Sequence, residues 1–147
     1  EKEFKAAVTQ LKDKACRAMV FGDIYLLEHQ SWIDRVCKDL KIKPLEPLWE
    51  HSTEELIDEF VRLGFKAVIV SCKADVLGKE FLGQTVDRKL DKELKKRKLC
   101  PCGENGEYHT LVIDGPLFRR PIKIIETEPL LKEGFWKHWF LDIKKYA

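Results

Sequence analysis

Residues 52–71 read STEELIDEFVRLGFKAVIVS, and this stretch decides the fold class. Ser52 and Glu55 have the spacing of a capping box, apolar residues then recur every three or four positions, and Gly64 is a typical helix stop. The run from Phe65 to Ser71 is typical of a strand buried on both faces. A helix that leads through one glycine into a buried strand indicates an α/β protein.

The same two patterns occur before this stretch. Helical spacing is shared by two sets of apolar residues, Phe4, Ala7, Val8, Leu11 and Ala15, and then Ile33, Val36, Cys37 and Leu40, with Ser31 as a candidate cap of the second helix. Residues 18–21 form a short apolar run that predicts a strand buried on both faces and ends at Gly22-Asp23. Residues 42–49 are extended but contain two prolines, which favours a sheet edge. Strand, helix and strand therefore alternate as in a parallel sheet.

The pattern changes after residue 75. Val86, Leu90 and Leu94 mark a narrow helical stripe within a highly charged segment. Strands are predicted at 111–113, 121–126 and 136–143, antiparallel to the earlier ones, although the last could be a short helix. We expect the end of a parallel α/β sheet in a domain of residues 1–48, followed by a smaller α+β domain at 49–147.

Composition bounds the function classes. The chain has 147 residues, 44% of them hydrophobic, and a net charge of +2, which excludes a disordered chain and gives no chain-wide attraction for a polyanion. We find no apolar run of membrane-spanning length and no signal-peptide pattern, so we expect a cytoplasmic protein. The five cysteines are an odd number and are spread through the chain, which argues against a disulfide framework. Because Glu1 opens directly into a helical pattern, we expect the chain to begin within a longer protein.

Two strand ends offer candidate ligand positions, because ligands of parallel α/β sheets lie beyond the carboxyl ends of the strands. One strand ends at Gly22-Asp23 and another at Ser71-Cys72-Lys73. Asp23 could hold a ribose hydroxyl, a cation or an ammonium group, and it could equally cap the next turn.

The loop of residues 103–110, GENGEYHT, has the most unusual composition in the chain. If a strand begins at Glu107, then Glu107 and His109 share one face while Tyr108 and Thr110 take the other. A carboxylate and an imidazole on one face can position an amine or relay a proton. The alternative is a hairpin loop with solvated carboxylates and a hydrogen-bonded histidine.

Two further features have plain explanations. Cys100 and Cys102 stand too close together for a usual zinc pair, and no second ligand pair follows, so we predict no metal site and no zinc. Residues 88–98 carry seven basic and two acidic side chains, which could attract RNA or an acidic protein surface or could simply be a solvated helix face. Without an interleaved aromatic residue, nucleic acid is not the expected partner.

Five segments together resemble the diphthine–ammonia ligase family of ATP pyrophosphatases, over about residues 5–126. They are residues 20–23 (VFGD), 47–49 (PLW), 63–65 (LGF), 102–110 (CGENGEYHT) and 114–118 (DGPLF). The chain departs from the family in lacking the Ser-Gly-Gly-Lys-Asp-Ser phosphate loop and in a longer segment from Asp23 to Cys37. Asn105 stands where glycine is usual in the ligases, as in bacterial members.

The resemblance implies a Rossmann-like nucleotide α-hydrolase sheet followed by a substrate domain. It implies activation of a carboxylate with release of pyrophosphate, then amide formation with ammonia, with ATP and Mg²⁺ bound mostly by a segment outside this chain. The implied residues are Gly22 and Asp23 near the nucleotide or at the junction of the two domains, Glu104, Glu107 and His109 as catalytic residues, and Gly103, Asn105, Gly106 and Thr110 against the acceptor.

The implied partner is a small or protein-borne carboxylate, in archaeal or eukaryotic-like members the diphthine of an elongation factor. No membrane partner is expected, and homo-oligomerisation is left open. A non-catalytic binding module without an ATP site remains the alternative.

Overall fold

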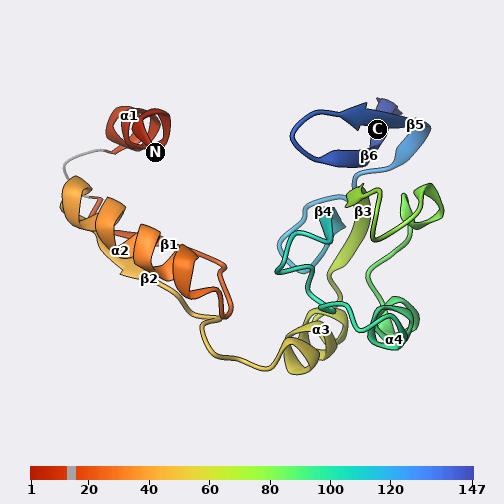
Figure 1. Cartoon of the computed structure of the whole chain (residues 1–147), viewed down its shortest axis with the longest axis horizontal. Coiled ribbons are helices and arrows are strands. Elements are labelled where there is room, and N and C mark those ends of the chain that lie inside the picture. Colours follow the sequence, from red (N-terminus) through yellow and green to blue (C-terminus); the bar gives the residue numbers. More distant parts are fainter. Residues whose placement is uncertain (13–15) are drawn as a thin grey trace. The chain divides into compact units, whose positions relative to one another are not determined.

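The computed structural model describes residues 1–12 and 16–147 and divides into two units, Glu1–His51 and Ser52–Ala147 (Figure 1). The domain boundary expected between residues 48 and 49 falls in the turn at 47–50, just before this division. None of the described helices is both long and apolar enough to cross a membrane.

The first unit is a small parallel α/β structure. Its elements are α1 (Lys2–Leu11), β1 (Ala18–Val20), α2 (Leu27–Leu40) and β2 (Lys43–Leu45). The two strands pair in parallel, as expected, and Pro44 lies opposite Met19. The core consists of Ile33 and Cys37 of α2 with Ile42, and Val8 and Met19 pack against it.

The structure differs from two expectations for this unit, and part of a third concerns a residue outside the described ranges. The strand at β1 is not buried on both faces, because Val20 is 64% exposed and β1 pairs only with β2 among the described strands. The second helix does not begin after Ser31 but at Leu27, where the Leu26 carbonyl accepts from the backbone amides of two later residues. Ala15, assigned to the first helical stripe, lies outside the described residues.

The second unit is built on a four-stranded antiparallel sheet. Its elements are α3 (Thr53–Arg62), β3 (Lys66–Lys73), the 3-10 turn η1 (Lys79–Phe81), α4 (Arg88–Lys96), β4 (Tyr108–Asp114), β5 (Ile124–Glu133) and β6 (Lys137–Tyr146). The strand order is β4-β3-β6-β5. The antiparallel strands are confirmed, and the last segment is a strand rather than a helix. However, β3 runs antiparallel to both neighbours, so the alternation of strand and helix does not continue the parallel sheet.

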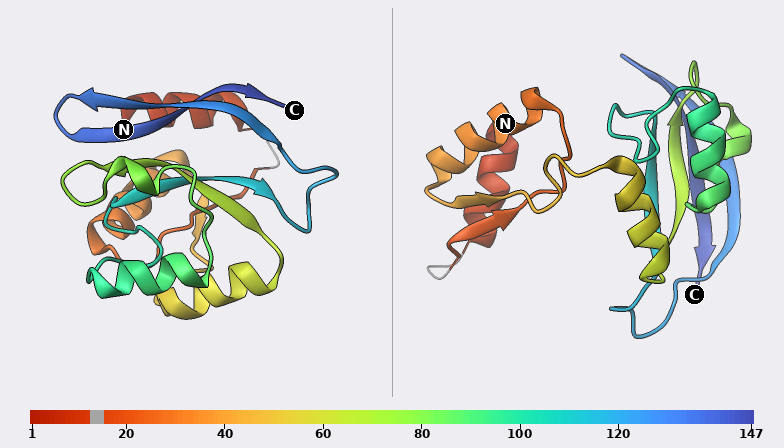
Figure 2. Two further views of the ribbon diagram at one scale, coloured as in Figure 1. Left: turned by 90° about the vertical axis from the view of Figure 1, so that its right-hand side faces the viewer. Right: turned by 90° about the horizontal axis from the view of Figure 1, so that it is seen from below.

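One face of this sheet is covered by α3 and α4, which lie on the same side of it (Figure 2). Ile57 of α3 and Leu94 of α4 belong to one buried cluster with Ala67, Ile69 and Cys72 of β3. We call this the covered face. The side chains that alternate with these along the strands point to the other face, on which no described helix of this unit lies, and we call it the open face.

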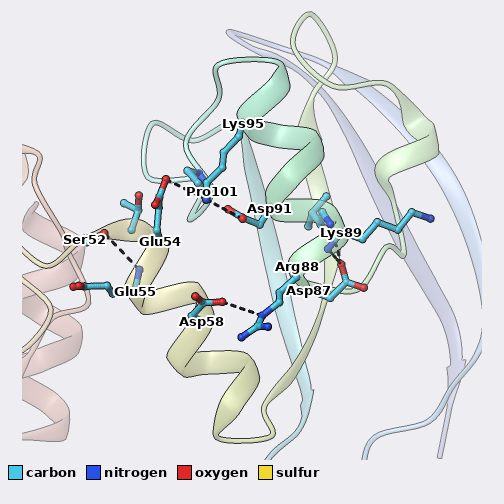
Figure 3. A network of polar contacts seen from close by, with 12 residues as sticks. Ser52, Glu54, Glu55, Asp58, Asp87, Arg88, Lys89, Asp91, Lys95 and Pro101 are labelled. Atoms are coloured by element: carbon cyan, nitrogen blue, oxygen red, sulfur yellow. Dashed lines mark hydrogen bonds and ion pairs between the residues drawn. The ribbon is translucent and has the colours of Figure 1, made fainter.

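Polar contacts hold α3 and α4 side by side (Figure 3). Arg88 Nε lies 3.1 Å from Asp58 Oδ1, and Lys95 Nζ lies 3.1 Å from Glu54 Oε1 and 2.9 Å from Asp91 Oδ2. The two pairs that join the helices, Arg88–Asp58 and Lys95–Glu54, are mostly exposed, so each contributes little to stability, whereas the Lys95–Asp91 pair lies within α4. The side chain of Ser52 caps the start of α3, as expected, and the side chain of Asp87 caps the start of α4.

Candidate functional site

The loop of residues 100–107 is closed by the carboxylate of Glu107, which is only 5% exposed. Its Oε1 accepts from the backbone amide of Cys100 at 3.0 Å and from the Asn105 side-chain amide at 3.1 Å. Its Oε2 accepts from the backbone amide of Asn105 at 3.0 Å. A buried carboxylate needs such donors, and here they join both ends of the loop. The loop is therefore a preorganised unit.

Glycine is required at two positions of this loop. Gly103 and Gly106 have φ of +68° and +74°, in the region that favours glycine. A Cβ on Gly103 would also lie 2.9 Å from the Tyr108 carbonyl oxygen. The Tyr108 hydroxyl donates to the carbonyl of Pro101, and burial raises the pKa of this phenol, so it stays a donor. Both ends of the loop are thus pinned to the start of β4.

The two cysteines of this loop are part of its framework. Cys102 Sγ lies 3.4 Å from the Thr53 carbonyl oxygen, and burial, with smaller effects from Cys100 and Glu104, raises the pKa of its thiol to about 12. The thiol therefore belongs to the buried packing around the loop, and the absence of zinc stays a prediction.

Lys73, at the end of β3, joins the loop to the tip of the β5–β6 hairpin. Its Nζ donates to the Asn105 carbonyl at 2.8 Å and lies 5.7 Å from the centroid of the Trp136 ring. Its backbone amide donates to the Glu107 carbonyl at 3.0 Å. Trp136 is 63% exposed and contacts the ring of Phe135 edge to face. An ammonium group and exposed aromatic rings therefore border the loop.

A hollow of about 520 Å³ lies on the open face beside this arrangement. It is lined by Val70, Ser71, His109, His138, Phe140 and Leu141. Ser71 lies opposite His109 on β4 and opposite Phe140 on β6, while His138 lies opposite Lys73. The hollow thus has an imidazole on either side of β3, and Lys73, which pairs with His138, contacts the loop.

The expected residues do not all meet. Glu107 and His109 do not share a strand face, because β4 begins at Tyr108 and the Glu107 carboxylate is bound inside the loop. Tyr108 belongs to the covered face, and His109 is exposed on the open face. Thr110 alternates to the side opposite His109 and does not line the hollow. Glu104 lies half-buried in the loop.

Sequence reasoning missed several residues of this site. Ser71 and Lys73 were noticed only as a strand end, and His138 and Trp136 not at all. Their signal is weak, because only the pairing of β6 with β3 brings His138 next to residues far away in sequence.

A second candidate position lies at the carboxyl edge of the parallel strands in the first unit. Asp23, just after β1, pairs with His29, Oδ1 to Nδ1, at 2.8 Å. Glu46 follows β2, and its buried Oε1 meets no hydrogen-bond partner within the described ranges. Burial, then the charges of Asp34 and Asp23, raise the pKa of Glu46. A Cβ on Gly22 would meet no atom within 4 Å, so the backbone there is open to approach.

Comparisons with known proteins agree with this division of the chain. The family model described as the diphthamide synthase C-terminal domain matches residues 52–147, and the N-terminal domain model of the same family matches residues 1–44.

Curated relatives carry the name diphthine–ammonia ligase. The fission yeast Schizosaccharomyces pombe protein is 37% identical over 114 residues, which cover 76% of this chain and 19% of that protein. The mouse and human proteins are 33% and 34% identical, each over 67% of this chain and 39% of their own length. The chain therefore spans about a fifth to two fifths of these relatives, and it belongs to the diphthamide synthase family.

Proposed function

We propose that this chain supplies the acceptor-substrate domain of an ATP-dependent ligase that forms an amide from a carboxylate and ammonia. Residues 52–147 would hold the acceptor, and residues 1–51 would form part of the nucleotide side. Membership of the family supports this proposal, as does the name of the relatives, diphthine–ammonia ligase, which pairs diphthine with ammonia. An acceptor of this kind is a protein-borne carboxylate of an elongation factor.

One observation carries the proposal. The Glu107 carboxylate closes a rigid loop directly before the strand that carries His109, and His109 lines a hollow on the open face. A ligase needs its acceptor held in one orientation, which preorganised backbone and fixed side chains provide. Glu107 then acts as a positioning residue, and its carboxylate does not contact the acceptor.

The open-face residues have distinct proposed roles. Lys73 and the backbone of residues 103–106, which do not line the hollow, orient the part of the acceptor that reaches the loop. When ammonia forms the new C–N bond to an activated carboxylate, AMP leaves and one proton must be removed from the nitrogen. The imidazole of His109 is exposed in the hollow and can accept that proton. We assign no role to Thr110.

ATP supplies the activation of the carboxylate when it is bound. The first unit fits part of a nucleotide, because the backbone at Gly22 is open and Asp23 and Glu46 place acceptor oxygens at one sheet edge. Such oxygens suit a ribose hydroxyl or Mg²⁺. These 147 residues contain no Ser-Gly-Gly-Lys-Asp-Ser stretch, so we place the phosphates on another part of the whole protein.

The test is steady-state pyrophosphate release and amide formation by the whole protein with its acceptor. Replacement His109→Asn removes the proton acceptor, so we expect kcat to fall roughly 10²-fold or more while KM and thermal unfolding change little. His51→Asn, at an exposed histidine at the end of the first unit, is the matched control.

Two results would contradict the assignment. An unchanged kcat in His109→Asn would remove His109 from the chemistry. Saturable acceptor binding by a whole wild-type protein that forms no amide would favour the non-catalytic binding module instead.

A further inference from the structure

A larger hollow, of about 880 Å³, lies along α4 in the second unit. It shares no lining residue with the hollow at His109. Its charged lining consists of five basic residues, Arg88, Lys89, Lys92, Lys96 and Arg97, and three acidic ones, Glu80, Asp87 and Glu93. Nothing in the proposed ligase chemistry uses this surface.

The basic residues of this hollow fall into two groups. Arg88 pairs with Asp58, and Arg97 pairs with Glu93 at 2.9 Å while lying over the Phe81 ring. Lys89, Lys92 and Lys96 are exposed and meet no acidic partner within the described part of the chain. These last three form what we call the lysine stripe.

The lysine stripe lies along one side of α4. Its members are three and four residues apart, which aligns them on a helix, and they span about 10 Å along its axis. Helix stabilisation does not explain them all. Lys96 is favourable near the C-terminus, but Lys89 lies in the first turn, where the helix dipole disfavours a cation. The helix dipole therefore does not account for Lys89.

We propose that the lysine stripe and its hollow dock an acidic peptide segment of a partner protein. Charge complementarity calls for carboxylates opposite the three lysines. The uncharged polar side chains of Gln84 and Thr85, which also line the hollow, suit a peptide of mixed character. This docking surface is independent of the acceptor site.

Nucleic acid is the less suitable occupant. The aromatic residue of the hollow, Phe81, is only 2% exposed and is covered by Arg97, so it offers no platform for base stacking.

The test measures binding of a fluorescein-labelled peptide of ten glutamates to the 147-residue chain by fluorescence anisotropy. The test variant is K89E/K92E/K96E, and the matched control is K2E/K38E/K43E at three exposed lysines of the first unit. Each triple variant changes the net charge by −6, from +2 to −4. A third variant, Lys→Gln at the three stripe positions, keeps good helix formers while removing the charge.

We expect saturable wild-type binding that weakens with salt, because exposed charges are screened. The stripe reversal should raise Kd about tenfold or more and the Lys→Gln variant less, whereas the control should stay within about twofold. Circular-dichroism melts of every variant establish that the fold is retained.

Three results would overturn the proposal. They are no saturable binding by the wild type, equal weakening by the stripe and control reversals, and tighter binding of a labelled ten-nucleotide uridylate than of the glutamate peptide. The absence of saturable binding would exclude a docking site, and equal weakening would attribute the binding to net charge alone. Tighter binding of the uridylate would identify a nucleic-acid surface. None of them bears on amide formation by the whole protein, so this proposal and the ligase proposal fail separately.

Discussion

The covered and open faces of the antiparallel sheet come from the same strands, but one packs into the core and the other lines a hollow. On the covered face, Ala67, Ile69 and Cys72 of β3 pack into the core with α3 and α4. On the open face, the same strand contributes Ser71 to the hollow and Lys73 to the loop. Alternation along one strand thus separates the side chains that pack into the core from those that line the hollow.

An irregularity in β3 sharpens this division. The register with β4 shifts between Ile69 and Ser71, so Ile69 lies opposite Thr110 while Ser71 lies opposite His109. Both Val70 and Ser71 line the hollow as a result. A bulge of this kind redirects side chains without breaking the sheet, which is why bulges occur beside binding sites. The comparison of the two faces can be tested by the changes below.

The largest effect is expected from truncation on the covered face. Leu94→Ala, at a side chain with no exposure, should lower the free energy of unfolding by about 2–5 kcal/mol, because it leaves a cavity among well-packed neighbours. Leu130→Ala on β5, where the side chain is 40% exposed, should cost about 1 kcal/mol or less. Urea unfolding of both variants measures the difference, and equal losses would erase the distinction between the faces.

The second largest effect is expected from removing the charge of Glu107, whose carboxylate closes the loop. Glu107→Gln replaces one accepting oxygen by an amide that faces a donor, so we expect a loss of about 1.5–3 kcal/mol and faster amide exchange at Cys100 and Asn105. Glu55→Gln, at an exposed position of α3, is the control. Unchanged stability together with lost activity would instead place the Glu107 carboxylate in contact with the acceptor.

A smaller effect is expected where the loop meets the open face. Lys73→Met removes the ammonium that binds the Asn105 carbonyl and lies over Trp136, which should cost about 1 kcal/mol and shift the Trp136 indole resonance. Lys66→Met, at the other end of β3, loses only an exposed pair with Asp114 and should leave that resonance in place. The same resonance in both variants would mean that Lys73 does not hold the hairpin tip.

The smallest effect is a pH dependence of the covered face. Burial raises the pKa of Cys72 to about 11 and that of Cys102 to about 12, above the ordinary thiol value of 9.0. The neutral thiols therefore contribute stability that is fully present below pH 9 and is lost as the pH rises through 11 and 12. Cys102→Ala should accordingly cost less at pH 10.5 than at pH 7.5 in urea unfolding. An equal cost at both pH values would show that the thiol titrates normally.

Local patterns predicted most elements of the fold, because they depend on neighbours in the chain. The cap at Ser52, the stripe of α3 and the positive-φ glycine at position 64 lie within one short segment, and all three occur as expected. The parallel pair of β1 and β2 also followed from the alternation of strand and helix. Element starts were less predictable, as at α2, whose N-cap residue is Leu26 rather than Ser31 and makes no side-chain cap hydrogen bond.

The candidate site was predictable in composition but not in arrangement. The loop at 103–110 stood out by its residue types, yet the direction of the Glu107 carboxylate depends on amides at Cys100 and Asn105 that only the folded loop brings near it. Glu107 would share a strand face with His109 only if β4 began one residue earlier, at Glu107 rather than at Tyr108. A shift of one position reverses the side on which every strand residue lies.

The sequence by itself determined the main helices, the buried strand β3, the turn glycine at position 64 and the family, since each depends on residue types at short spacing. Only the tertiary structure decided that β3 pairs antiparallel with β4 and β6, and that His138 and Trp136 come near the loop. The physical reason is that strand pairing joins segments more than sixty residues apart through backbone hydrogen bonds, which every residue type except proline can make. Side-chain identity records which face of a strand is buried, but not which strand lies beside it.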